Sequence, residues 1–152
     1  MRKFPSNPGS QWLVVSGWMS VAASLLHIGC ILGGPDWYRF FGAGEDMARA
    51  AEQGRWIPAI LTSIIAAILA GWAAFAFAAA GKIVRLPLIR TALVLISAVL
   101  LLRSLAVFSP SFWAPEHSMA FRIWSSAIVF VLGACFALGT WRAWPTLSVK
   151  AA

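Results

Sequence analysis

Four long apolar runs constrain this chain more than any other feature of its sequence. They cover residues 12–33, 57–80, 88–108 and 119–141, and none of them contains Asp or Glu. About 20 apolar residues in an α-helix are enough to cross the hydrocarbon core of a bilayer. The pattern therefore predicts an all-α, polytopic membrane protein, a four-transmembrane-helix bundle that forms one domain over residues 1–152.

The composition excludes an ordinary soluble domain. Of the 152 residues, 61% are hydrophobic and 11% are charged, whereas soluble domains average about 45 to 50% apolar and about 25% charged residues. The segments between the apolar runs leave no room for a separate catalytic or nucleic-acid-binding domain. The net charge of +7 is explained by membrane topology, so we expect no nucleic-acid partner.

The distribution of charge predicts the orientation. Seven basic residues and no acid occur near the two termini and around the turn at 81–87: Arg2, Lys3, Lys82, Arg85, Arg90, Arg142 and Lys150. On the opposite side, five arginines balance five acids: Arg39, Arg49, Arg55, Arg103 and Arg122 against Asp36, Glu45, Asp46, Glu52 and Glu116. Positive loops stay in the cytoplasm. We therefore predict a multi-pass protein of the cell (inner) membrane with cytoplasmic N- and C-termini. The high alanine content and the lack of an N-x-S/T acceptor favour a bacterial membrane.

The longest connection, residues 34–56, lies on the predicted outer side. Its portion 43–53 carries acids and arginines at helical spacing, which predicts one short interfacial helix. Four aromatic residues precede it: Trp37, Tyr38, Phe40 and Phe41. We expect them to form an aromatic roof over an outward-facing pocket, or alternatively an interfacial anchor.

Stripes of small residues predict which helix faces pack together. Ser16, Ser20, Ser24 and His27 follow one face of the first span, and Ser63, Ala67 and Gly71 follow one face of the second. Ser126, Gly133 and Ala137 form a comparable stripe in the fourth. Small residues let transmembrane helices approach closely, so we place all three stripes in the bundle interior.

Polar residues at shallow depth define the candidate ligand site. At a rise of 1.5 Å per residue, His27, Arg103 and Arg122 lie roughly 9, 8 and 5 Å inside the outer ends of their helices. The predicted ligand-binding set is His27, Arg39, Glu45, Asp46, Arg103, Glu116, His117 and Arg122. We expect Arg103 to face the interior near His27, within reach of Glu45, Asp46 or Glu116, because an unpaired arginine at this depth is unfavourable.

Each of these residues also has a simpler structural interpretation. Arg103 and Arg122 could extend to the headgroups, and His27 could bond a serine or a carbonyl within the bundle. The charges in the loop could form a solvated helix face. However, all lysines are on the cytoplasmic side and every outer base is arginine. The guanidinium fork pairs with carboxylates in two parallel hydrogen bonds, which favours fixed ion pairs or capture of an acidic ligand.

Familiar catalytic and metal-binding patterns are missing from the sequence. Cys30 and Cys135 fall at different depths, which excludes a disulfide, and the absence of C-x-x-C argues against a redox enzyme of the vitamin K epoxide reductase type. No histidine pair has metal-ligand spacing and no phosphate-binding loop occurs, so we predict no metal and no cofactor. The enzyme alternative would use His117 or Glu116 as an acid or base beside arginines.

Two function classes remain beside the enzyme. A transporter is one alternative, but the small multidrug transporters of similar size use a carboxylate within a helix, which no span has here. The favoured hypothesis is a non-enzymatic binding, sensing or accessory module. Its expected partners are the lipid bilayer, a lipid or acidic amphiphile in the outer pocket, and another membrane protein or a second copy of the chain.

Overall fold

The computed structural model describes residues 7–109, 112–113, 115 and 117–147, and every regular element within them is helical. The elements are α1 (Ser10–Gly33), α2 (Pro35–Phe40), α3 (Glu45–Glu52), α4 (Ile57–Ala79), α5 (Ile89–Ser104), the 3₁₀ helix η1 (Leu105–Phe108) and α6 (Met119–Leu147). Four helices are long and apolar enough to cross a membrane: α1, α4, α5 extended by η1, and α6. The all-α fold class and the four apolar helices are thus confirmed.

Helix α6 continues past the predicted end of the fourth apolar run at Trp141. It reaches Leu147 and contains Pro145. Proline has no N–H, so one helical hydrogen bond is missing here. Because Pro145 lies in the last turn of α6, the loss does not affect the preceding turns. Thr146 Oγ1 donates to the Ala143 carbonyl at 2.7 Å within this last turn.

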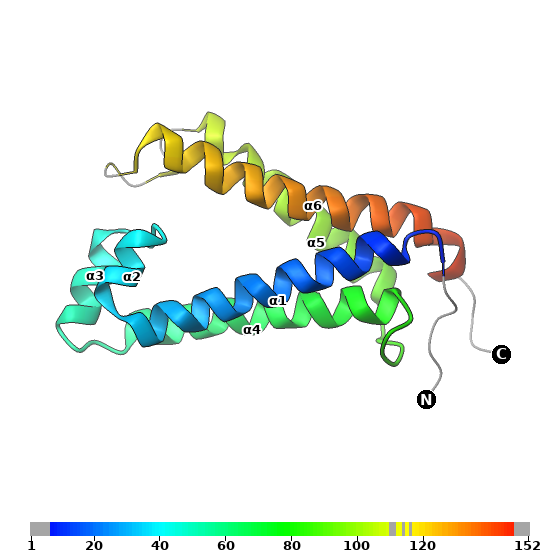
Figure 1. Cartoon of the computed structure of the whole chain (residues 1–152), viewed down its shortest axis with the longest axis horizontal. Helices are drawn as coiled ribbons and strands as arrows, with labels where there is room; N and C mark the ends of the chain where they lie inside the picture. Colours follow the sequence, from blue (N-terminus) through cyan, green and yellow to red (C-terminus); the bar gives the residue numbers. More distant parts are fainter. Residues whose placement is uncertain (1–6, 110–111, 114, 116, 148–152) are drawn as a thin grey trace.

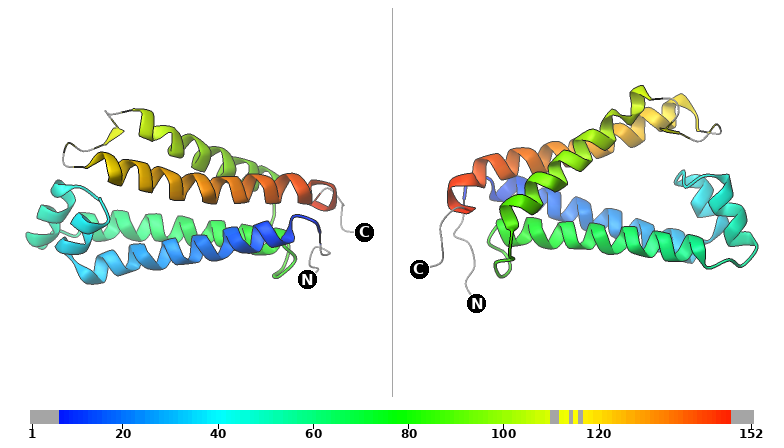
Figure 2. Two further views of the ribbon diagram at one scale, coloured as in Figure 1. Left: turned by 45° about the horizontal axis from the view of Figure 1, so that its top comes forward. Right: turned by 180° about the vertical axis from the view of Figure 1, so that it is seen from behind.

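The helices are arranged as two antiparallel hairpins. Helix α1 packs along α4, and α5 packs along α6 (Figure 1). The hairpins lie close together at the end where α1 begins and α6 ends, which we call the terminal end. They diverge toward the end that carries α2 and α3, which we call the distal end (Figure 2).

Close backbone contact joins the hairpins at the terminal end. A Cβ atom on Gly9 would overlap the backbone of Gly139 and Ala143, and a Cβ atom on Gly139 would lie 2.8 Å from Leu13 Cγ. Leu13 and Ala143 are fully buried there. The glycines therefore allow α1 and α6 to approach more closely than larger residues would permit. The main apolar core lies around this contact and includes Phe136 of α6.

The small-residue stripe of α1 faces the interior as predicted. Ser16, Ser20 and Ser24 are buried, and Ser24 Oγ donates to the Ala66 carbonyl of α4 at 2.8 Å. In α6, Ser126 and Gly133 are buried and Ala137 is half-buried. A hydroxyl that bonds a neighbouring helix at mid-helix depth ties α1 to α4 through a polar contact.

The predicted stripe of the second apolar run is wrong. Ser63 and Ala67 are exposed, and no atom lies within 4 Å of the position that a Cβ on Gly71 would occupy. The buried face of α4 is shifted around the helix and contains Thr62, Ala66, Leu69 and Ala73. This helix is apolar on all sides, so its sequence does not distinguish the face that packs from the face that does not.

The connection at the distal end contains two short helices where one was expected. The predicted helix within 43–53 is observed as α3, and α2 precedes it. Gly42 and Gly44 adopt positive φ angles of 74° and 94° between the two, a conformation that favours glycine. Trp37 of α2 packs over Gly29 and Gly33 of α1, where no side chain would fit. The segment is thereby folded against the end of the first hairpin.

Candidate functional site

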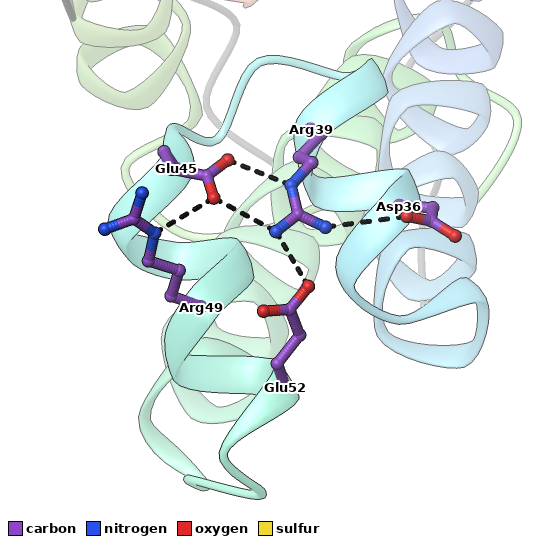
Figure 3. Close-up of polar contacts among 5 residues, drawn as sticks. All are labelled: Asp36, Arg39, Glu45, Arg49 and Glu52. Atoms are coloured by element: carbon purple, nitrogen blue, oxygen red, sulfur yellow. Dashed lines mark hydrogen bonds and ion pairs between the residues drawn. The ribbon is translucent and has the colours of Figure 1, made fainter.

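An ion-pair network fixes α2 to α3 (Figure 3). Arg39 lies at its centre: Nε donates to Glu45 Oε2 at 2.9 Å, and Nη2 donates to Glu45 Oε1 at 3.0 Å and to Glu52 Oε1 at 2.7 Å. Arg39 Nη1 lies 3.5 Å from Asp36 Oδ1. Arg49 Nε donates to Glu45 Oε1 at 3.1 Å. The bidentate Arg39–Glu45 pair joins two helices that are adjacent in the chain, so it orders the segment.

The network determines the charge states of its members. Hydrogen bonds from Arg39 and then from Arg49 lower the pKa of the Glu45 carboxyl to about 2. The hydrogen bond to Glu45 raises the pKa of Arg39 above its ordinary value. Glu45 therefore stays ionised and Arg39 stays protonated throughout the physiological pH range. These two groups provide fixed charges and do not exchange protons near pH 7.

The four aromatic residues between positions 37 and 41 do not form one layer. Tyr38 is buried at 3% exposure against Cys30 and Ala48, whereas Phe40 is 78% exposed. Phe41 contacts both Trp37 and Phe40, with ring centroids 5.6 and 5.0 Å apart. Trp37 and Tyr38 thus pack toward α1, whereas Phe40 and Phe41 lie on the exposed side of the segment.

A second cluster, formed by aromatic rings, lies where α6 begins. The His117 ring stacks on Phe121, with centroids 4.8 Å apart and an interplanar angle of 14°. Trp113 meets both rings edge to face, and its Nε1 donates to the Ala106 carbonyl at 2.8 Å. Hydrogen bonding of a buried indole fixes its orientation, so this cluster forms an ordered end to the second hairpin.

Arg103 lies beside two aromatic rings. Its guanidinium carbon lies 4.8 Å from the Phe112 ring centroid and 4.7 Å from that of Trp113, and it forms no ion pair with Glu45 or Asp46. Arg103 Nη1 is buried and has no hydrogen-bond partner within the described part of the chain. The ring faces attract the cation. Glu116, the third acid expected within reach of Arg103, lies outside the described residues.

A cavity of about 380 Å³ lies between the two distal clusters. Arg39, Gly44 and Glu45 line it from the first hairpin, and His117, Ser118 and Phe121 line it from the second. Gly42 closely approaches Phe121, since a Cβ atom at Gly42 would overlap the ring. The cavity therefore lies between the α2–α3 segment and the start of α6, with fixed charges on one wall and an aromatic stack on the other.

The cavity contains part of the predicted ligand set. Arg39, Glu45 and His117 line it, and Arg122 is adjacent because its Nε donates to the His117 carbonyl at 3.2 Å. His27 is not a lining residue: its Nδ1 donates to the Ala23 carbonyl of its own helix at 2.7 Å.

Of the two remaining predicted acids, Asp46 does not line this cavity. Asp46 is exposed and has no ion-pair partner among the residues from 7 to 109 and from 117 to 147. Glu116 lies outside the described residues. Among the described residues, three of the predicted set line this cavity: Arg39, Glu45 and His117.

Sequence reasoning missed three lining residues: Gly44, Ser118 and Phe121. Phe121 follows His117 by four residues, but His117 precedes α6, which begins at Met119, so helical spacing does not account for their stack. The position of Gly44 depends on the turn between α2 and α3, which sequence periodicity does not describe.

Two further features concern the cysteines and the potential metal ligands. Cys30 and Cys135 are both free thiols, as their different depths predicted. Within the described residues, no group of three or more His, Cys, Asp or Glu side chains has an arrangement suited to a metal ion.

No protein-family model matches this chain, and the comparisons with curated proteins and with solved structures found no match.

Proposed function

We propose that this chain is a multi-pass membrane protein of an inner membrane, with its terminal end in the cytoplasm. The fold supports this orientation because Lys82, Arg85, Arg90 and Arg142 belong to the terminal end. The acids Asp36, Glu45, Asp46 and Glu52 belong to the distal end. The outward surface of α4 carries exposed Ile60, Ile64 and Ile68, as expected for a surface in contact with lipid.

We further propose that the distal end is a non-enzymatic binding module for an amphiphile with an acidic head group. The observation that carries this proposal is the cavity of about 380 Å³ between the hairpins, a volume typical of small-molecule sites. Its charged wall suits a polar head, and the His117–Phe121 stack suits an apolar chain. Arg39 Nη1 has only the 3.5 Å contact with Asp36, so it retains donor capacity for an acidic group.

The charge states favour binding over catalysis. A general base works best with a pKa near the operating pH, whereas the pKa of Glu45 is about 2. Arg39 remains protonated because Glu45 and Glu52 accept its hydrogen bonds. The two charged groups of the cavity can therefore hold a ligand by fixed electrostatic contacts but are poorly suited to proton transfer.

Native mass spectrometry of the protein, extracted from membranes in a mild detergent, tests the binding module. We expect a bound amphiphile that is released by Phe121→Ala, because burial of a phenyl ring contributes about 1.5 to 3 kcal/mol, or roughly a tenfold to a hundredfold change in affinity. Phe40→Ala is the matched control, since Phe40 is exposed and does not line the cavity.

Four outcomes would overturn the proposal. Wild-type protein without a bound amphiphile would contradict it, as would equal occupancy in the Phe121→Ala and Phe40→Ala variants. A stoichiometric protein partner in place of the amphiphile would assign the distal end to an accessory subunit. Turnover of the bound molecule would assign the site to an enzyme.

A further inference from the structure

A second cavity, of about 240 Å³, lies on the first hairpin, away from the cavity between the hairpins. It is bounded by the α2–α3 segment and the N-terminus of α4, and Tyr38, Arg55, Trp56 and Pro58 are among its lining residues. None of its lining residues is an acid. Three independent features of this cavity point to the same kind of ligand.

The first feature is the beginning of α4. Trp56 is its N-cap residue and provides no side-chain hydrogen bond to the first turn. The first N–H groups of a helix have no partner within the helix, and together with the helix dipole they attract anions. Pro58 has no N–H and the Ile60 N–H donates to the Trp56 carbonyl at 3.0 Å, so Ile57 and Ala59 supply the amide donors of this turn. Helix α4 has 23 residues, so its dipole is fully developed.

The second feature is the cation beside this helix end. Arg55 precedes the N-cap and has no ion-pair partner in the range from residue 7 to residue 109. The acid closest to it in sequence, Glu52, is held by Arg39 at 2.7 Å. In the network of Figure 3, Glu52 pairs with Arg39, so this acid does not neutralise the charge of Arg55.

The third feature is a buried hydroxyl. Tyr38 is 3% exposed, and its phenolic oxygen has no hydrogen-bond partner among the residues that the structure describes. An unpaired buried hydroxyl costs about 1 to 3 kcal/mol, so structures rarely retain one without a ligand or water. As a donor, this group suits an anionic oxygen.

We propose that this cavity binds a phosphate group, with Arg55 supplying the charge, the first turn of α4 the amide donors and Tyr38 a hydroxyl donor. Phosphate combines the negative charge and the several acceptor oxygens that these donors require. The surroundings favour the phosphodiester of an outer-leaflet phospholipid: Trp56 is 80% exposed and Leu32 of the adjacent α1 end is 83% exposed, where acyl chains would lie. Free inorganic phosphate carries the same chemistry.

The experiment has two ligand arms and uses the full chain in a neutral detergent. Native mass spectrometry measures binding of a short-chain phosphatidylglycerol, with a monoacylglycerol as the phosphate-free amphiphile. Thermal unfolding, followed by tryptophan fluorescence, measures the effect of inorganic phosphate against chloride at equal ionic strength. We expect the phospholipid to bind and the monoacylglycerol not to bind. Stabilisation by inorganic phosphate alone would retain the site but identify its ligand as the free anion.

Variants connect the binding to the cavity. Arg55→Gln removes the charge and should weaken phospholipid binding by about tenfold or more, because hydrogen bonds to charged groups contribute about 1.5 to 3 kcal/mol. Tyr38→Phe removes only the hydroxyl and keeps the ring, and it should weaken binding by several-fold. Arg49→Gln is the control, because Arg49 is an exposed arginine of the same segment that does not line the cavity.

Two results would overturn the inference. One is an absence of binding in both ligand arms. The other is an equal affinity of the Arg55→Gln and Arg49→Gln variants, which would show that nonspecific charge attracts the lipid. The Phe121→Ala variant should retain phosphate binding, so a failure of the cavity between the hairpins and a failure of this one are distinguishable.

Discussion

The contact between the two hairpins depends on the lack of a side chain at Gly139, and Gly139→Ala should weaken it. The new Cβ atom would lie 2.8 Å from Leu13 Cγ and 3.1 Å from the Leu13 backbone nitrogen. The matched change is Gly71→Ala on α4, where the new methyl group would meet no atom within 4 Å. Both glycines lie inside long apolar helices. The two variants therefore gain the same methyl group in opposite packing environments.

The expected effect follows from two opposing contributions. Alanine stabilises a helix interior relative to glycine by up to about 1 kcal/mol, and this gain applies to both variants. At Gly139, the helices must separate by several tenths of an ångström, because 2.8 Å is below ordinary van der Waals contact. Overpacking of this kind costs about 1 to 3 kcal/mol. Gly139→Ala should therefore unfold with a free energy about 1 to 3 kcal/mol below that of Gly71→Ala.

Reversible unfolding in mixed detergent micelles, monitored by tryptophan fluorescence and circular dichroism, measures this difference. Gly71→Ala should equal or exceed the parent in stability, and Gly139→Ala should fall below Gly71→Ala. Equal stability of the two variants would refute the close approach of α1 and α6. A large loss in Gly71→Ala would show that the exposed face of α4 is covered, and the assignment of this face to lipid would then be wrong.

Three further predictions test orientation, electrostatics and the position of Arg103. In a cysteine-free background, Gln53→Cys should react with an impermeant thiol reagent in intact cells while Lys82→Cys is protected, and the reverse pattern would invert the topology. The pKa of Glu45 is lowered from 4.5 to about 2, so its ion pairs stabilise the α2–α3 segment fully above pH 4.5 and are lost as the pH falls toward 2. Carboxyl NMR should detect this titration, and in Arg39→Gln its midpoint should move from about 2 toward 4.5, with Arg49 still donating to Glu45; a midpoint that stays near 2 in that variant would contradict the pairing. Arg103→Met should lower the unfolding free energy by about 0.5 to 2 kcal/mol through loss of the cation–π contacts, and Arg103→Lys by less; equal stability of both variants and the parent would show that these contacts contribute nothing.

The sequence by itself determined the class of the fold and its charge distribution. Run length and hydropathy are local properties, and they placed four apolar helices in the observed order. Helical spacing of the charges within 43–53 was sufficient to identify α3, because i, i+3 and i, i+4 neighbours share a face whatever the rest of the chain does.

The tertiary structure decided which faces meet and which partners the charges have. An apolar helix has no polar face to exclude from the interior, so the stripe of Ser63, Ala67 and Gly71 gave no reliable direction, and packing against α1 selected Thr62 and Ala66 instead. The partner of Arg103 depended on where the chain after η1 returns to the bundle. That return places two aromatic rings beside the guanidinium. A guanidinium can be stabilised by aromatic ring faces as well as by a carboxylate.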